Sequence, residues 1–141
     1  MKQNKLFSAA IALLLIAFFT TSWVFPTPTP TTPTAVTITA VYDFSTFPNV
    51  SGTFTTSGAL TISGTTTMDI GLNVNGKRGH CVVVLTAWNG TITIHQECQF
   101  GSSPAKGRWE IVSGTGAYTN LKGNGSLTMP GTSEAMTGVI Y

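Results

Sequence analysis

The sequence predicts an all-β domain of seven or eight short antiparallel strands, arranged as a sandwich or a closed barrel. Apolar and polar residues alternate with a period of two along several segments, for example where Trp109 and Ile111 alternate with charged residues. Glycine, proline and asparagine separate these segments at short intervals, as turns between strands do. No segment from Val36 onward carries a persuasive helical period.

Residues 1–22 are predicted to be a secretory signal peptide. Lys2 and Lys5 form a basic start, residues 6–19 are an almost unbroken apolar run, and small residues precede a cleavage site after Ser22. The run is short for a membrane span, and an uncleaved membrane anchor is the alternative. We therefore expect a secreted or periplasmic protein.

Residues 23–35 are rich in proline and threonine and are predicted to be a linker. Each proline fixes its own φ and favours an extended predecessor, so the segment is expected to be polyproline-like and solvated. It is either a spacer between the membrane or wall and the domain, or an unstructured mature N-terminus. Residues 36–141 then form one β-domain of ordinary size.

The formal charge of the predicted domain is zero. Five basic residues (Lys77, Arg78, Lys106, Arg108 and Lys122) face five acidic ones (Asp43, Asp69, Glu97, Glu110 and Glu134). This balance leaves no electrostatic signature for nucleic acid or for an anionic membrane. We expect membrane contact only through the signal segment before cleavage.

The strands are placed by their alternation and by the residues that interrupt them. Residues 36–44 alternate as a half-buried strand that Pro48 and Asn49 end, and residues 73–77 are a turn. The last strand follows Pro130 and Gly131. The remaining strands or bent strand pieces cover 52–57, 59–62, 65–72, 108–111 and 126–129, and the last strand covers 136–141.

Asn89-Gly90 predicts a two-residue type I′ hairpin, because these residues tolerate the positive φ angles of that turn. The pairing that follows places Cys81 opposite Cys98 at a spacing close to that of a disulfide. With a secretory signal, we expect a disulfide, and buried thiols are the alternative. The same hairpin has an apolar face predicted to point into the core: Cys81, Val83, Leu85, Ala87, Ile92, Ile94 and Cys98.

The opposite face of this hairpin carries the candidate polar chemistry. His95 and Glu97 share one side of a strand, and the predicted register places His80 beside Gln99, too far from His95 for joint ligation. A histidine beside a carboxylate suits a general base, and two histidines with a glutamate suit a metal. We expect instead a solvated outer face and no metal site. Arg108 and Glu110 also share a strand face and are predicted to be an exposed ion pair.

Three aromatic residues, Tyr42, Trp109 and Tyr118, are expected to fill the core or, if the fold encloses a cavity, to line it. The Gly-Thr-Gly sequence at 114–116 is not a phosphate loop, because no lysine and serine or threonine follow and it opens no helix. There is no serine nucleophile elbow and no cysteine-based metal motif. The sequence therefore predicts no cofactor.

The segment 107–127 resembles a known family. A strand with Trp109 and Ile111 is followed by Gly-Thr-Gly, a compact stretch around Tyr118, the glycines Gly123 and Gly125, and another strand. This order resembles the allene oxide cyclase/dirigent-like small β-barrel superfamily, which includes an uncharacterised bacterial secreted branch. The resemblance implies a single small antiparallel β-barrel of about eight strands.

The resemblance also implies what such a barrel does. Characterised members cyclise an unstable fatty-acid epoxide or guide phenoxy-radical coupling in an apolar interior, and in the cyclases a buried carboxylate and an ordered water assist. Glu97 and Glu110 are both expected to point outward, so no catalytic residue is transferred to this chain.

Three functions remain open. The sequence favours a non-enzymatic barrel that binds a small apolar ligand or a surface partner. The alternatives are a cyclase-like or dirigent-like enzyme that steers a reactive lipid or phenolic intermediate, and a structural envelope protein with a filled barrel. The sequence predicts neither the ligand nor the oligomeric state.

Overall fold

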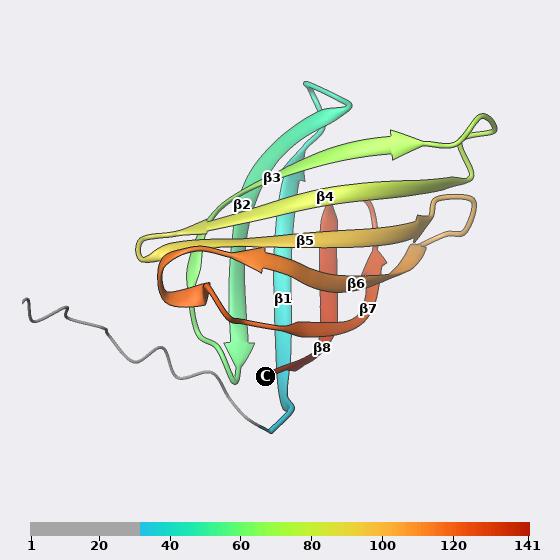
Figure 1. The fold of residues 1–141 in the computed structure, drawn as a ribbon. Coiled ribbons are helices and arrows are strands. Elements are labelled where there is room, and N and C mark those ends of the chain that lie inside the picture. Colours follow the sequence, from blue (N-terminus) through green and yellow to red (C-terminus); the bar gives the residue numbers. More distant parts are fainter. Residues whose placement is uncertain (1–31) are drawn as a thin grey trace, which may run out of the picture.

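A computed structural model describes residues 32–141, which form a closed barrel of eight antiparallel strands (Figure 1). Each strand pairs with its neighbours in sequence, and β8 closes the barrel by pairing with β1. The prediction of a small antiparallel barrel is confirmed. The elements are β1 (Thr34–Asp43), β2 (Asn49–Gly58), β3 (Ser63–Leu72), β4 (Arg78–Ala87), β5 (Gly90–Gln99), β6 (Ala105–Gly114), the short 3₁₀ helix η1 (Gly116–Tyr118), β7 (Gly123–Met129) and β8 (Ser133–Ile140).

The predicted signal peptide, residues 1–22, and most of the predicted linker, 23–35, lie outside the described residues. The barrel itself begins at Thr34, two residues before the predicted start of the domain. Because the closed sheet leaves no unpaired strand edge and surrounds its own core, residues 32–141 meet the criteria for an independently folding unit. No helix within them is long and apolar enough to cross a membrane.

The core fills the interior of the barrel with side chains from alternate positions of each strand. In β1, for example, Val36, Ile38, Ala40 and Tyr42 are all buried and point inward, as the alternation predicts. The predicted inward face of the β4–β5 hairpin is also confirmed, with Cys81, Val83, Leu85, Ile92, Ile94 and Cys98 each at most 3% exposed.

Residues 59–62 form a connection between β2 and β3 instead of the predicted strand piece. Gly58 adopts a φ of 89°, which ends β2, and the buried Thr56 side chain organises the loop that follows. The Thr56 hydroxyl donates to the carbonyl of Leu60 at 2.8 Å and accepts from the backbone N–H of Ile62 at 2.9 Å. A local side-chain hydrogen bond thus replaces strand pairing here.

The predicted register of the β4–β5 hairpin is wrong by two residues. Ala87 pairs with Gly90, so the turn consists of Trp88 and Asn89, and no non-glycine residue in the described chain has a positive φ. The turn is therefore not type I′. Asn89 is held by contacts from distant sequence, because the Tyr118 hydroxyl donates to its side chain and the Ala117 N–H donates to its carbonyl. Gly90 lies in β5, where the carbonyl of Thr115 occupies the space that a side chain would need.

The predicted disulfide is wrong for the same reason. Cys81 pairs with Gln96, and Cys98 pairs with Gly79, so the two cysteines are diagonal neighbours. Diagonal positions in an antiparallel pair are roughly 7–8 Å apart, which exceeds the Cα spacing of a disulfide. Both residues are free, buried thiols, and contact with Cys81 together with burial raises the pKa of the Cys98 thiol.

The two ends of the barrel differ in the loops that they gather. We call one end the mouth; it collects the loops at 44–48, 73–77, 100–104 and 130–132. We call the other end the far end; it collects the loop at 59–62, the Trp88–Asn89 turn and the η1 segment. Side chains from loops at the same end of the barrel can share a site, although these loops are distant in the sequence.

Candidate functional site

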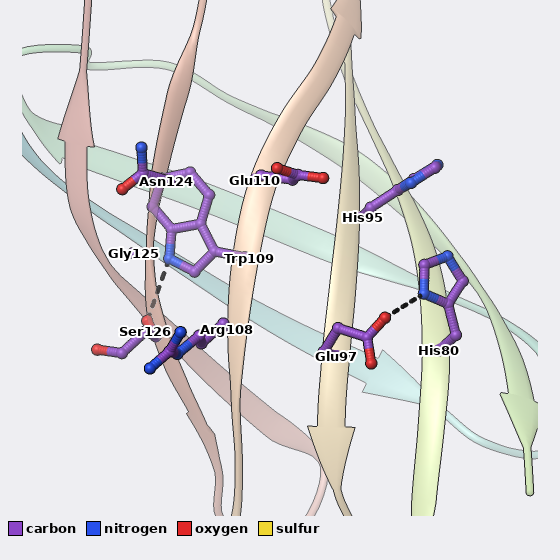
Figure 2. Close-up of a pocket in the computed structure, with 9 residues that line it drawn as sticks. All are labelled: His80, His95, Glu97, Arg108, Trp109, Glu110, Asn124, Gly125 and Ser126. Carbon is purple, nitrogen blue, oxygen red and sulfur yellow. Dashed lines mark hydrogen bonds and ion pairs between the residues drawn. The ribbon is translucent and has the colours of Figure 1, made fainter.

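The first candidate site is a groove of about 600 Å³ on the outer wall of the barrel, over β4 to β7 (Figure 2). Outward-facing polar side chains of neighbouring strands form it, and Gly125 and the largely buried Trp109 complete its lining. The lining residues are His80, His95, Glu97, Arg108, Trp109, Glu110, Asn124, Gly125 and Ser126.

The corrected register brings the two histidines and Glu97 together. His80 lies opposite Glu97, not Gln99, and its Nδ1 is 3.1 Å from Glu97 Oε1. The rings of His80 and His95 meet edge to face with their centroids 5.0 Å apart. The prediction that His80 lies too far from His95 is therefore wrong. The Glu97 side chain is 80% exposed, so the pair is weak in water.

Arg108 and Glu110 do share the outer face of β6, but they do not form the predicted ion pair. The His80–Glu97 pair is the one ion pair within residues 32–141. Arg108 lies opposite Glu97 and Ser126, and Glu110 lies opposite His95 and Asn124. In the same residues, no group of three histidine, cysteine or acidic side chains is arranged to hold a metal ion. The groove is a solvated polar surface with a mixed set of charges.

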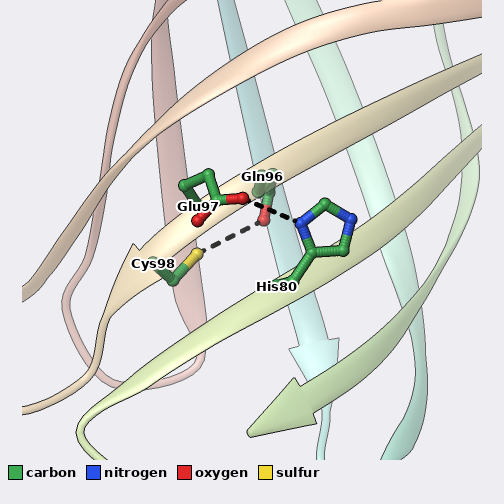
Figure 3. A network of polar contacts seen from close by, with 4 residues as sticks. All are labelled: His80, Gln96, Glu97 and Cys98. Carbon is green, nitrogen blue, oxygen red and sulfur yellow. Dashed lines mark hydrogen bonds and ion pairs between the residues drawn. The ribbon is translucent and has the colours of Figure 1, made fainter. Parts of the chain in front are cut away.

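The second candidate site is a buried carboxylate inside the barrel. Glu134, at the start of β8, is 0% exposed and points into the core. The Tyr42 hydroxyl donates to its Oε2 at 2.9 Å, and Gln96 Nε2 donates to its Oε1 at 2.8 Å. Cys98 Sγ in turn lies 3.8 Å from Gln96 Oε1. Figure 3 shows how β5 alternates, with Gln96 and Cys98 on the inner face and Glu97 on the outer face.

Burial dominates the electrostatics of this cluster. Removal from water raises the pKa of Glu134 to about 7, although the hydrogen bonds from Tyr42 and Gln96 act in the opposite direction. Burial and the neighbouring Glu134 charge raise the pKa of Tyr42, so the phenol stays protonated and remains a donor. Near neutral pH, the carboxyl is therefore balanced between its protonated and ionised forms, as a proton-transfer group needs to be.

Sequence reasoning missed Glu134 because it began the last strand at Met136. In the structure β8 begins at Ser133, and Glu134 then falls on the same inward face as Met136 and Ile140. Extending the alternation of Met136 and Ile140 backward by one step would have predicted an inward carboxylate.

The third candidate site is an apolar recess of about 320 Å³ at the mouth. All four mouth loops contribute to it, and its apolar side chains come from Phe44, Phe47, Ile70, Leu72, Phe100, Ala105 and Met129. Phe44 also packs edge to face against Tyr42, with the ring centroids 6.2 Å apart. One aromatic contact therefore connects the recess to the Tyr42–Glu134 pair below it.

The three aromatic residues predicted to line a ligand cavity do not meet in one site. Tyr42 holds Glu134 below the mouth. Trp109 lies across Gly125 and Gly138 in mid-barrel, where its indole N–H donates to the carbonyls of Ser126 and Thr137 at 3.1 and 3.3 Å. Tyr118 closes the far end through its hydrogen bond to Asn89.

No family model, no curated protein and no solved structure matches this chain. The site must therefore be interpreted from its own chemistry.

Proposed function

We propose that this protein is a non-enzymatic binding module that takes a small apolar ligand into the recess at the mouth of its barrel. The observation that carries the proposal is the recess itself. Its volume lies within the range of small-molecule pockets, roughly 300–1,000 Å³, and seven apolar side chains line it. The predicted signal peptide supports a place of action outside the cytoplasm.

The recess suits an apolar ligand better than a polar one. Its walls offer aromatic rings and aliphatic chains from Phe44, Phe100, Ile70 and Met129, and no charged side chain lines it. Each Å² of apolar ligand surface removed from water contributes about 25 cal/mol. A ligand of a few carbon rings is therefore held mainly by the hydrophobic effect.

Titration with N-phenyl-1-naphthylamine, an apolar fluorophore, tests the proposal. Binding to the barrel domain is expected to raise and blue-shift the emission. Ala105→Phe places a ring in the recess and is expected to abolish this change. Ala87→Phe is the matched control, because Ala87 is also a half-buried alanine at a strand end that packs on the core, but at the far end. Equal binding by both variants would contradict the proposal.

One observation favours the enzymatic alternative. Glu134 is a buried carboxylate that Tyr42 and Gln96 hold by hydrogen bonds, and burial raises its pKa to about 7. The resemblance to allene oxide cyclase/dirigent-like barrels implies that the cyclases also use a buried carboxylate. The buried Thr66 hydroxyl lies beside the phenol of Tyr42 and adds a further polar side chain to this cluster.

This alternative is tested by generating an unstable fatty-acid epoxide in the presence of the protein and separating the product enantiomers. An enzyme would give an enantiomeric excess that Glu134→Gln removes, while Glu97→Gln, on the outer wall, leaves it unchanged. A racemic product at high protein concentration would count against catalysis. If neither probe binding nor turnover is found, the third function, a structural envelope barrel filled by its own side chains, is favoured.

A further inference from the structure

The mouth carries an uneven distribution of exposed apolar side chains. Phe47, Leu72 and Val74 are 53%, 46% and 109% exposed, and all three lie on or beside the β1–β2 and β3–β4 loops. Val74 stands at the tip of the β3–β4 hairpin and does not line the recess. Exposed apolar groups that cluster in this way mark an interaction surface.

Basic residues lie beside the apolar tip of the β3–β4 loop, where Lys77 and Arg78 follow Val74, and at the start of β6, where Lys106 lies. Lys77, Arg78 and Lys106 are all exposed at the mouth. The exposed Asp43 ends β1, and the exposed Asp69 lies opposite Asn49 at the start of β2, so two acidic residues flank the β1–β2 loop, whereas Glu97 lies opposite Arg108 on the wall. Lys77 is fixed against the neighbouring loop, because its carbonyl accepts from Gly101 N–H at 3.1 Å and its side chain packs over that glycine. Three of the five basic residues of the barrel thus gather at one end.

We propose that the mouth docks onto an anionic lipid bilayer, with the apolar tips entering the headgroup region and the three basic side chains contacting lipid phosphates. Apolar groups rimmed by lysine and arginine have the composition of interfacial membrane anchors. The far end carries the exposed Trp88 and Tyr141 but a single basic residue, Lys122, and so lacks the group of basic side chains.

Docking of the mouth on a bilayer adds a source of ligand to the proposed function, and this consequence rests on that function. A mouth held against a bilayer receives an apolar ligand directly from the lipid, without passage through water. It also revises the expectation that membrane contact is confined to the signal segment. That expectation used the net charge of the domain, which is zero, and net charge does not report where the charges lie.

Co-sedimentation with lipid vesicles tests the docking. The barrel domain, residues 32–141, is mixed with phosphatidylcholine vesicles with or without an equal part of phosphatidylglycerol. We expect stronger binding to the anionic vesicles, weakened by salt above about 0.1 M. Lys77→Ala is expected to weaken binding about fivefold, since each basic group near such a surface contributes about that factor. Val74→Ser is expected to weaken it about tenfold.

Matched controls come from the far end. Lys122→Ala removes the same charge as Lys77→Ala, and Trp88→Ser removes a larger exposed apolar group than Val74→Ser. Both controls are expected to bind vesicles as the parent does. Equal losses in Lys122→Ala and Lys77→Ala, or no preference for anionic vesicles, would overturn the docking.

Vesicle-free titration with N-phenyl-1-naphthylamine separates the two proposals. Val74→Ser and Lys77→Ala leave the deep part of the recess intact and are expected to bind the fluorophore normally. Fluorophore binding without vesicle binding would overturn the docking and leave the proposed function standing. Vesicle binding without fluorophore binding would support the docking and overturn the transfer of ligand from lipid.

Discussion

Glu134→Gln removes the buried charge while keeping the shape of the side chain, and it is expected to change how the stability of the barrel depends on pH. The ordinary pKa of a glutamate is 4.5, and burial raises the pKa of Glu134 to about 7 in the folded protein. Below pH 4.5 the carboxyl is protonated in both folded and unfolded states. Between these values the folded state holds a proton that the unfolded state has lost. The free energy of unfolding therefore falls as pH rises, and it levels off above about pH 7.

The magnitude follows from the interval between the two pKa values. At about 1.4 kcal/mol per pKa unit, the parent is expected to lose about 3 kcal/mol of stability between pH 4.5 and 8. For a domain of this size, that loss corresponds to a fall in Tm on the order of 10 °C. Glu134→Gln has no proton to lose, so its stability is expected to lack this component. The free energy of unfolding of the variant should match that of the parent near pH 4.5 and exceed it at pH 8.

Urea unfolding at a series of pH values, followed by intrinsic tryptophan fluorescence, measures the effect. Subtracting the variant's curve from the parent's removes every contribution that the two proteins share. Parallel curves for the two proteins would refute the reasoning, because they would mean that Glu134 ionises in the folded state as it does in water. A parent that grows more stable from pH 5 to 8 relative to the variant would refute its sign.

Three further outcomes are expected. Gly138→Ala should lower the free energy of unfolding by about 1–3 kcal/mol, because the new methyl group would overlap the backbone carbonyl of Asn124 and lie 2.8 Å from Cζ2 of Trp109. Gly71→Ala should lower the free energy of unfolding less, since the atom nearest to its new methyl group is the His80 carbonyl oxygen at 3.3 Å. Similar urea midpoints for the two variants would contradict this expectation. Tyr118→Phe removes the hydroxyl that holds Asn89 and should cost about 1 kcal/mol in thermal unfolding, whereas Tyr141→Phe should have no effect. Cys81 and Cys98 should resist alkylation by N-ethylmaleimide until the protein is unfolded, because both thiols are buried. The intact mass should not change with reductant, and an increase of two hydrogens on reduction would show that a disulfide exists.

The sequence-based register of the β4–β5 hairpin failed while its assignment of faces succeeded, for one reason. An error of two residues changes every partner across a pair of strands but moves no side chain to the other face, because the side-chain period is two. Val83 and Ile94 therefore point inward as predicted. Cys81 and Cys98 no longer meet, and His80 gains Glu97 as its neighbour.

The candidate sites were harder to predict because each one gathers residues that are distant in sequence. The partners of Glu134 are Tyr42, 92 residues away, and Gln96, 38 residues away. The recess needs all four mouth loops. Alternation within a strand can tell that a side chain points inward, but it cannot tell which inward side chains share a layer of the barrel.

The sequence by itself determined the all-β class, a number of strands of seven or eight, and most of the inward-facing residues, since these follow from local alternation and turn residues. The resemblance of the segment 107–127 added the choice of a barrel over a sandwich. Only the tertiary structure decided the hairpin register, because Tyr118 and Ala117 reach across to hold Asn89 in place of a local turn preference. It also decided that Glu134 is buried and that the basic residues gather at the mouth, because closure of the sheet sets which strand ends meet.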